Sequence, residues 1–165
     1  MYRHIIAAVD GSPSASHALQ EAAQLARQMQ AALTVVHLLD LQQLARGDHE
    51  LIPLAESLAQ ARLHGQTLLA QACRQIQAAA DIEVRHYLGE CWHGKRDMAM
   101  VLTRFAREVD ADLLVLATHG QGGMRHMLMG SFSEHVMRQA SCPMMMVRYN
   151  PARASTPAPQ TMSNA

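Results

Sequence analysis

The chain lacks the features that would direct it to a membrane, a nucleic acid or an oxidising compartment. Lysine plus arginine and aspartate plus glutamate number 14 each, so no overall charge attracts DNA, RNA or an anionic lipid surface. No apolar run is long enough to span a bilayer, and residues 1–4 lead directly into an apolar strand, which leaves no room for a signal peptide. The 3 cysteines are widely spaced and do not suggest a disulfide framework. We therefore expect a cytoplasmic protein with no membrane or nucleic-acid partner.

Two common phosphate-binding motifs and a zinc site are also missing. The sequence contains neither a Walker A motif nor the dinucleotide pattern Gly-x-Gly-x-x-Gly. Cys91-x-His93 together with Cys142 suggests a metal at first sight, but no set of four ligands has zinc spacing. The methionines at 124, 127, 129 and 144–146 could bind copper, although apolar packing is the usual role of methionine. We expect no metal site, apart from Mg²⁺ that Asp10 could hold beside a bound phosphate.

Apolar runs and helical stripes alternate along the chain. The runs at 5–9, 33–39 and 113–117 are continuous, which is typical of parallel strands covered on both faces, and a last strand follows Pro143. The segment 82–88 alternates instead and indicates a strand at the sheet edge. Helices are expected from Ser12 and Pro13 to Met29, over 54–79, over 98–109 and after Gly130, with connections at 40–53 and 90–96.

This βαβαβαβαβ order predicts an α/β fold with a doubly wound, five-stranded parallel sheet, strand order 3-2-1-4-5 and helices on both faces. Gly65 falls on the apolar face of its helix, where it permits close packing. We expect one domain over residues 1–149 and a disordered tail over 150–165, which is rich in proline, alanine and serine.

The region 113–148 contains the strongest candidate site. An apolar strand leads into Gly120, Gly122 and Gly123, and Gly130 stands at an apparent helix start, an arrangement that can bind phosphate through main-chain N–H groups. Ligands of doubly wound sheets bind at the carboxyl ends of strands where the winding reverses, here between the first and fourth strands. Asp10 lies at that point. Its carboxylate either binds a ribose or base, or caps the following helix, and the residues leave both readings open.

The whole constellation resembles the universal stress protein family. The resemblance rests on Ala117-Thr-His-Gly120, nine further residues, Gly130-Ser131, a helix, and Cys142-Pro143 before a strand that ends at Val147-Arg148. The opening stretch His4-Ile-Ile-Ala-Ala-Val-Asp10-Gly-Ser12 resembles the first strand and turn of that family. The nucleotide-binding branch has glycine where this chain has Ala117. A methyl group there is harmless if the position has ordinary strand geometry, whereas a positive φ or direct backbone contact with the ligand would require glycine. Because the later glycines of the pattern are present, we expect ATP binding to be retained.

The resemblance also implies roles for individual residues. Asp10 would contact the adenosine, the backbone of Leu38 just past the second strand would border the adenine, and Gly120, Gly130 and Ser131 would hold the phosphates. Arg125, His126 and His119 would either cover the phosphates or form a solvated basic tip, which is the usual state of loop residues. The residues expected to line the nucleotide are Ala8, Asp10, Leu38, Ala117, His119, Gly120, Gly122, Gly123, Arg125, Gly130, Ser131, Phe132 and Ser133.

The function that the resemblance implies is an ATP-binding regulatory module of the stress response. Its nucleotide state, with or without Mg²⁺, would modulate a homodimer or an unknown protein partner. The dimer would form through the last strand, with Met144, Met145, Met146 and Val147 as its apolar seam. One alternative is a nucleotide-free structural or interaction dimer, and a second is a slow ATPase or a protein that phosphorylates itself. No set of nucleophile, base and oxyanion donors indicates an efficient enzyme, and Asp10 lacks the neighbouring acids of a receiver domain.

Overall fold

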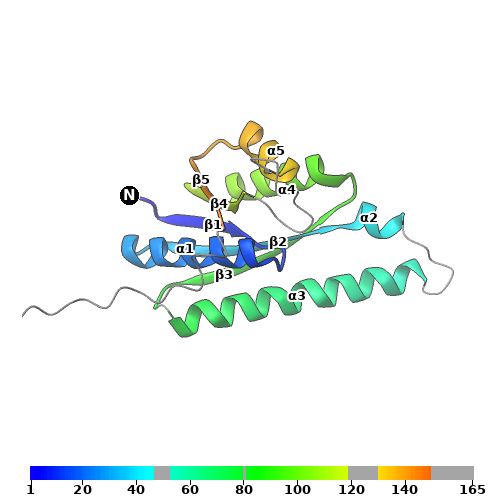
Figure 1. The fold of residues 1–165 in the computed structure, drawn as a ribbon, viewed down its shortest axis with the longest axis horizontal. Coiled ribbons are helices and arrows are strands. Elements are labelled where there is room, and N and C mark those ends of the chain that lie inside the picture. Colours follow the sequence, from blue (N-terminus) through cyan, green and yellow to red (C-terminus); the bar gives the residue numbers. More distant parts are fainter. Residues whose placement is uncertain (47–52, 80, 119–129, 150–165) are drawn as a thin grey trace, which may run out of the picture.

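The computed structural model describes residues 1–46, 53–79, 81–118 and 130–149. The strands and helices in this part of the chain are β1 (His4–Ala8), α1 (Pro13–Met29), β2 (Ala32–Asp40), α2 (Leu41–Ala45), α3 (Leu54–Ala79), β3 (Val84–Cys91), α4 (Gly94–Glu108), β4 (Leu113–Ala117), α5 (Ser131–Gln139) and β5 (Met144–Val147). All paired strands are parallel, and their order is β3-β2-β1-β4-β5 (Figure 1). The predicted doubly wound sheet is confirmed. None of the described helices is long and apolar enough to cross a membrane.

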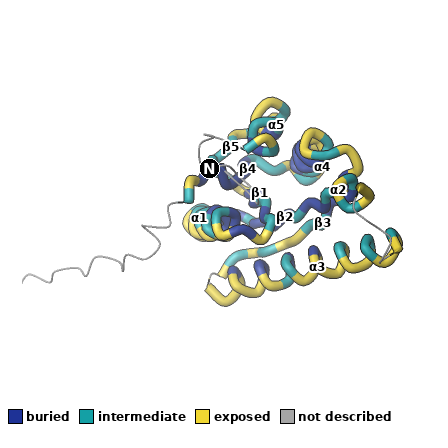
Figure 2. The backbone as a smooth tube through the Cα atoms, turned by 45° about the vertical axis from the view of Figure 1, so that its right-hand side comes forward, coloured by how far each residue is buried: buried dark blue, intermediate teal, exposed yellow. Residues whose placement is uncertain are grey.

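The sheet separates two layers of helices (Figure 1). Successive strand residues face opposite sides, so Ile5 packs toward α1 and α3 while Ile6 packs toward α4 and α5. The interior strand β4 is buried at every residue, whereas β3 at the edge is exposed or partly buried over Val84–Leu88 and becomes buried at Gly89 and Cys91. Figure 2 shows the buried strands between the helices and the largely exposed outer side of α3.

The expected start of α1 is confirmed. Ser12 is the N-cap, its Oγ accepts a hydrogen bond from the Ala15 N–H at 3.2 Å, and Pro13 occupies the first helical position. The helix ends at Gln30, which adopts a left-handed conformation with φ 54°. Its buried face consists of small side chains and one leucine: Ala15, Ala18, Leu19, Ala22, Ala23 and Ala26.

Gly65 allows α3 to lie directly on the sheet. A Cβ atom at this position would come within 2.8 Å of Leu88 Cδ1 and 3.1 Å of His37 Cδ2. The predicted close approach is therefore confirmed. The contact places α3 over the carboxyl half of β2.

Two of the expected connections are partly wrong. The segment after β2 begins with a short helix, α2, which was too short to give a periodic signal; residues 47–52 of that connection lie outside the described part. The linker expected at 90–96 is much shorter, because β3 continues to Cys91 and α4 begins at Gly94. The Asp97 carboxylate holds this tight turn by accepting hydrogen bonds from the N–H groups of Trp92 at 2.8 Å and His93 at 3.2 Å.

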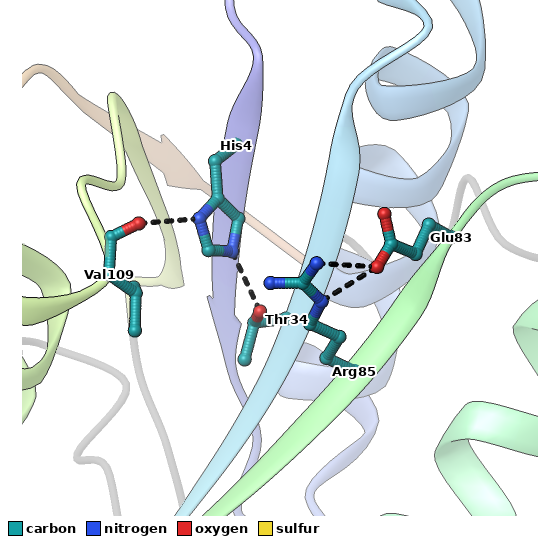
Figure 3. A network of polar contacts seen from close by, with 5 residues as sticks. All are labelled: His4, Thr34, Glu83, Arg85 and Val109. Carbon is teal, nitrogen blue, oxygen red and sulfur yellow. Dashed lines mark hydrogen bonds and ion pairs between the residues drawn. The ribbon is translucent and has the colours of Figure 1, made fainter.

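A histidine joins three elements at the amino ends of the strands (Figure 3). His4 Nδ1 donates to the Val109 carbonyl after α4 at 2.9 Å, and its Nε2 lies 2.8 Å from the Thr34 hydroxyl of β2. The Asp112 carboxylate accepts from the N–H groups of Arg3 and His4 at the same edge. These contacts fix the start of β1 between β2 and β4.

Candidate functional site

The strand register brings three predicted site regions to one level at the carboxyl edge of the sheet. Ala8 of β1 pairs with Val36 of β2. Asp10 and Leu38 each lie two residues further along their segments, so they are level with each other. Ala7 pairs with Val115 of β4, which puts Asp10 level with Thr118, at the beginning of the candidate phosphate loop. The winding reverses between β1 and β4, as predicted.

The backbone of Leu38 offers a donor and an acceptor at this edge. The Val36 carbonyl accepts from the Val9 N–H at 2.8 Å, and alternate residues of a parallel strand direct their N–H and C=O groups to the same neighbour. The corresponding groups of Leu38 therefore point to the side of β1, beyond Ala8, where that strand has ended. A donor and an acceptor in this arrangement can pair with the edge of a base.

The expected position of Leu38 just past the second strand is wrong. Leu38 lies within β2, which continues to Asp40 because β3 pairs with it up to Cys91. Its side chain is buried and packs over Gly89, where an added Cβ would meet Leu38 Cδ2 at 2.5 Å.

The start of α5 is where the sequence places it, but Gly130 is partly engaged. Gly130 is the N-cap with φ −73° and ψ 153°, and its N–H donates to the Thr118 carbonyl at 2.8 Å. The expectation of a free N–H at Gly130 is therefore wrong. The next N–H groups, of residues 131–133, belong to the first helical turn and have no acceptor within the helix. They and the positive end of the helix dipole can bind an anion.

The side chains at this helix start differ in what they can offer a ligand. The Ser133 side chain is buried, with 4% exposure for the residue, and its hydroxyl donates to the Ala117 carbonyl at 3.0 Å. Phe132 is half-buried and packs with the side chains beneath α4 and α5. Ser131 is exposed, so it presents its hydroxyl to the surface. Ser131 is thus the accessible hydroxyl, and Ser133 joins α5 to β4.

Ala117 has a backbone that tolerates a side chain. It is the last residue of β4 and pairs with Val147, and the Thr118 N–H donates to the Val147 carbonyl at 2.9 Å. Its conformation is that of an ordinary strand, in which glycine has no advantage. The methyl group at this position is compatible with the local fold.

Asp10 takes part in the turn between β1 and α1. Its Oδ1 accepts a hydrogen bond from the Ser12 N–H at 2.9 Å, which supports the N-cap of α1. The helix-capping role that the sequence left open for the Asp10 carboxylate is therefore present. The half-buried carboxylate also lies at the edge shared with Leu38 and Thr118, so a ligand role remains a proposal.

Sequence reasoning missed His37. Its Nδ1 donates to the Val9 carbonyl at 2.7 Å, and burial lowers the pKa of the imidazole. The Val9 bond and the Asp10 charge oppose this shift, whereas His64 adds to it. The available signal was a polar ring within an apolar strand, because such a group needs a hydrogen-bond partner when it is buried.

The remaining candidates do not form a metal centre in the part of the chain that the structure describes. No group of three or more His, Cys, Asp or Glu side chains is placed to hold an ion there. Cys91 is fully buried, and burial, with smaller contributions from Asp97, Asp40 and Glu90, raises the pKa of its thiol to about 12. The loop candidates lie outside the described residues: His119, Gly120, Gly122, Gly123, Arg125 and His126.

Comparisons with known proteins agree with this architecture. The Universal stress protein family matches residues 1–148. Universal stress protein A homolog 1 of Coxiella burnetii is 29% identical over 148 residues, which are 88% of this chain and 96% of that protein. A universal stress protein family structure from Burkholderia pseudomallei has a TM-score of 0.69 at 29% identity, with 88% of this chain and 96% of the other covered. The structure of the universal stress protein from Archaeoglobus fulgidus in complex with dAMP has a TM-score of 0.61 at 24% identity, with 89% and 98% covered.

Proposed function

We propose that this chain, which belongs to the universal stress protein family, binds ATP at the carboxyl edge of β1, β2 and β4 and serves as a regulatory module. The observation that carries the proposal is the level placement of two kinds of binding group. The Leu38 N–H and C=O point beyond the end of β1, and the end of β4 leads to the first turn of α5 through the bond between Thr118 and Gly130. The dAMP in the Archaeoglobus fulgidus structure supports an adenine nucleotide as the ligand.

Each part of the nucleotide has a candidate partner. In this proposal the Leu38 backbone pairs with the adenine edge, and Asp10 accepts from a ribose hydroxyl. The first-turn N–H groups of α5 and the Ser131 hydroxyl bind phosphate, and the loop residues Gly120, Gly122, Gly123 and Arg125 complete that part of the site. Asp10 is also the carboxylate that would contact Mg²⁺ brought by the phosphates.

The proposal includes a homodimer through β5. Pro143 and Val147 direct their carbonyls to β4, accepting from Leu114 and Thr118 at 3.0 Å and 2.9 Å, so the alternate residues Met144 and Met146 direct their backbone groups away from the sheet. A second copy of β5 can satisfy such an edge. Since Val147 is bonded to Thr118 at the candidate site, bound nucleotide can influence this strand.

The test is a direct search for the ligand. Protein purified without added nucleotide is extracted with acid and the extract is analysed by chromatography, and thermal unfolding is then compared with Mg-ATP, Mg-GTP and Mg-tripolyphosphate. We expect ATP to raise Tm more than the other two, because the proposed Leu38 contact is with the adenine edge. A ligand at 100 times its Kd stabilises the folded state by about 2.7 kcal/mol. An extract without nucleotide together with an unchanged Tm in ATP would support a nucleotide-free dimer instead.

A further inference from the structure

Val9 connects β1 to Asp10. Residues of β2 form hydrogen bonds with both polar groups of the Val9 backbone, the N–H and the carbonyl. The Val9 N–H donates to the Val36 carbonyl at 2.8 Å, in continuation of the strand pairing. The Val9 carbonyl instead accepts from a side chain, His37 Nδ1, at 2.7 Å. This carbonyl belongs to the same planar peptide unit as the Asp10 nitrogen. His37 therefore fixes the peptide on which Asp10 is carried.

The ring has little freedom to leave this position. α3 lies against it through Gly65, where a Cβ atom would approach His37 Cδ2 to 3.1 Å. Asp10 and His64 are the charged or titratable groups that act on the ring electrostatically. In the chain, His37 directly precedes Leu38, whose backbone forms the proposed adenine contact. One side chain thus joins the two residues assigned to the adenosine.

We propose that His37 is a positioning residue of the nucleotide site, which ties the Val9–Asp10 peptide to β2 and so sets the separation between Asp10 and the Leu38 backbone. This inference rests on the proposed function. A nucleoside that must reach both groups at once binds best when their separation is fixed beforehand, because no ordering of the turn is then needed on binding.

The experiment compares three variants with the wild type by calorimetric titration with Mg-ATP. His37→Leu removes the donor, whereas His37→Asn places an amide N–H the same number of bonds from Cα as Nδ1. His4→Leu is the matched control, because His4 Nδ1 makes the same kind of bond to Val109 at the opposite edge (Figure 3). We expect His37→Leu to weaken ATP binding roughly three- to ten-fold, His37→Asn to restore most of the affinity, and His4→Leu to leave it within about two-fold of wild type.

A second measurement needs no variant and so does not depend on folding. In ¹⁵N-labelled wild-type protein, ATP should shift the His37 ring N–H resonance and leave that of His4 unchanged. Two results would overturn the inference and leave the proposed function intact, provided that wild-type protein binds ATP. The first is equally strong ATP binding by His37→Leu, and the second is a His37 ring resonance that does not shift when ATP binds. Wild-type protein that does not bind ATP would remove both.

Discussion

The N–H of Gly130 donates to the carbonyl of Thr118 at 2.8 Å and joins the start of α5 to the end of β4. The two residues border the segment 119–129, so both ends of the candidate phosphate loop are fixed at one point. The Ser133 hydroxyl reinforces the junction through the Ala117 carbonyl at 3.0 Å. The first turn of α5 is thereby held at the edge of the sheet, level with Asp10.

Gly130→Val tests whether this junction is the phosphate site. The φ of −73° and ψ of 153° at Gly130 suit any residue, so the backbone conformation does not require glycine there. The hypothesis to test is that glycine leaves space for phosphate beside the first turn of α5. We expect valine to fill that space and to abolish the rise of Tm in Mg-ATP. Loss of the N-cap preference should cost about 1 kcal/mol at most in unfolding without ligand. A folded variant with wild-type ATP affinity would place the pocket elsewhere.

Gly89→Ala tests the packing behind the proposed adenine contact. The new Cβ would lie 2.5 Å from Leu38 Cδ2 and 3.1 Å from Val101 Cγ1, so the Leu38 side chain must move. We expect a loss of about 1–3 kcal/mol in the free energy of unfolding, measured in urea, and weaker ATP binding.

The matched control for that change is Gly65→Ala in α3. Its closest contact, at 2.8 Å, is with the end of the Leu88 side chain, and alanine adds about 1 kcal/mol of helix propensity. The stability loss should therefore be smaller than for Gly89→Ala. Equal losses at the two sites would contradict the idea that Leu38 is held firmly in place.

Met146→Pro tests the proposed dimer edge. The Met146 N–H points away from β4, so proline there removes a hydrogen bond only from a neighbouring copy. We expect the variant to be monomeric in sedimentation velocity and to lose only the part of its stability that comes from packing of the Met146 side chain against the core. Met145→Pro is the control, because it removes a donor that faces β4 and should destabilise the monomer itself. A Met146→Pro variant that remains a dimer would exclude this edge.

Stability should depend on pH through His37. Burial lowers the pKa of His37 in the folded protein below the ordinary value of 6.5, so the unfolded chain binds the extra proton first. The contribution of the neutral ring is complete above about pH 6.5 and is lost as the pH falls through the folded pKa. Urea unfolding between pH 5 and pH 8 should show a steeper acid loss for wild type than for His37→Asn, which keeps a donor but does not titrate. Equal pH dependence of the unfolding free energy in wild type and His37→Asn would contradict the assignment of this acid loss to His37.

Much of the fold follows from the hydrophobic pattern. β4 is apolar at every position and lies inside the sheet, whereas the sequence of β3 alternates and this strand lies at an edge, so the pattern separated these two positions correctly. Ser12 and Pro13 likewise marked the start of α1 correctly. These signals are local, and local propensity and tertiary packing agree at these positions.

The missed features depend on contacts between distant or weakly patterned residues. α2 spans only Leu41–Ala45, too few residues for a helical period, and the early start of α4 relies on a single carboxylate, Asp97. At the candidate site, the sequence indicated Gly130 as a helix start but could not show that Thr118 uses its N–H. The bond between His37 and Val9 was equally hidden, because the two residues meet only after β1 and β2 pair.

The alanine-lined face of α1 has a consequence for substitutions beneath this helix. Five alanines and Leu19 form its buried side, so the distance from helix to sheet is set largely by the backbone and methyl groups. The opposite layer contains Met98, Leu102 and partly buried Phe105, whose longer side chains can exchange volume with one another. Enlarging one of these alanines should therefore push α1 away from the sheet, because a methyl group has no other rotamer with which to make room.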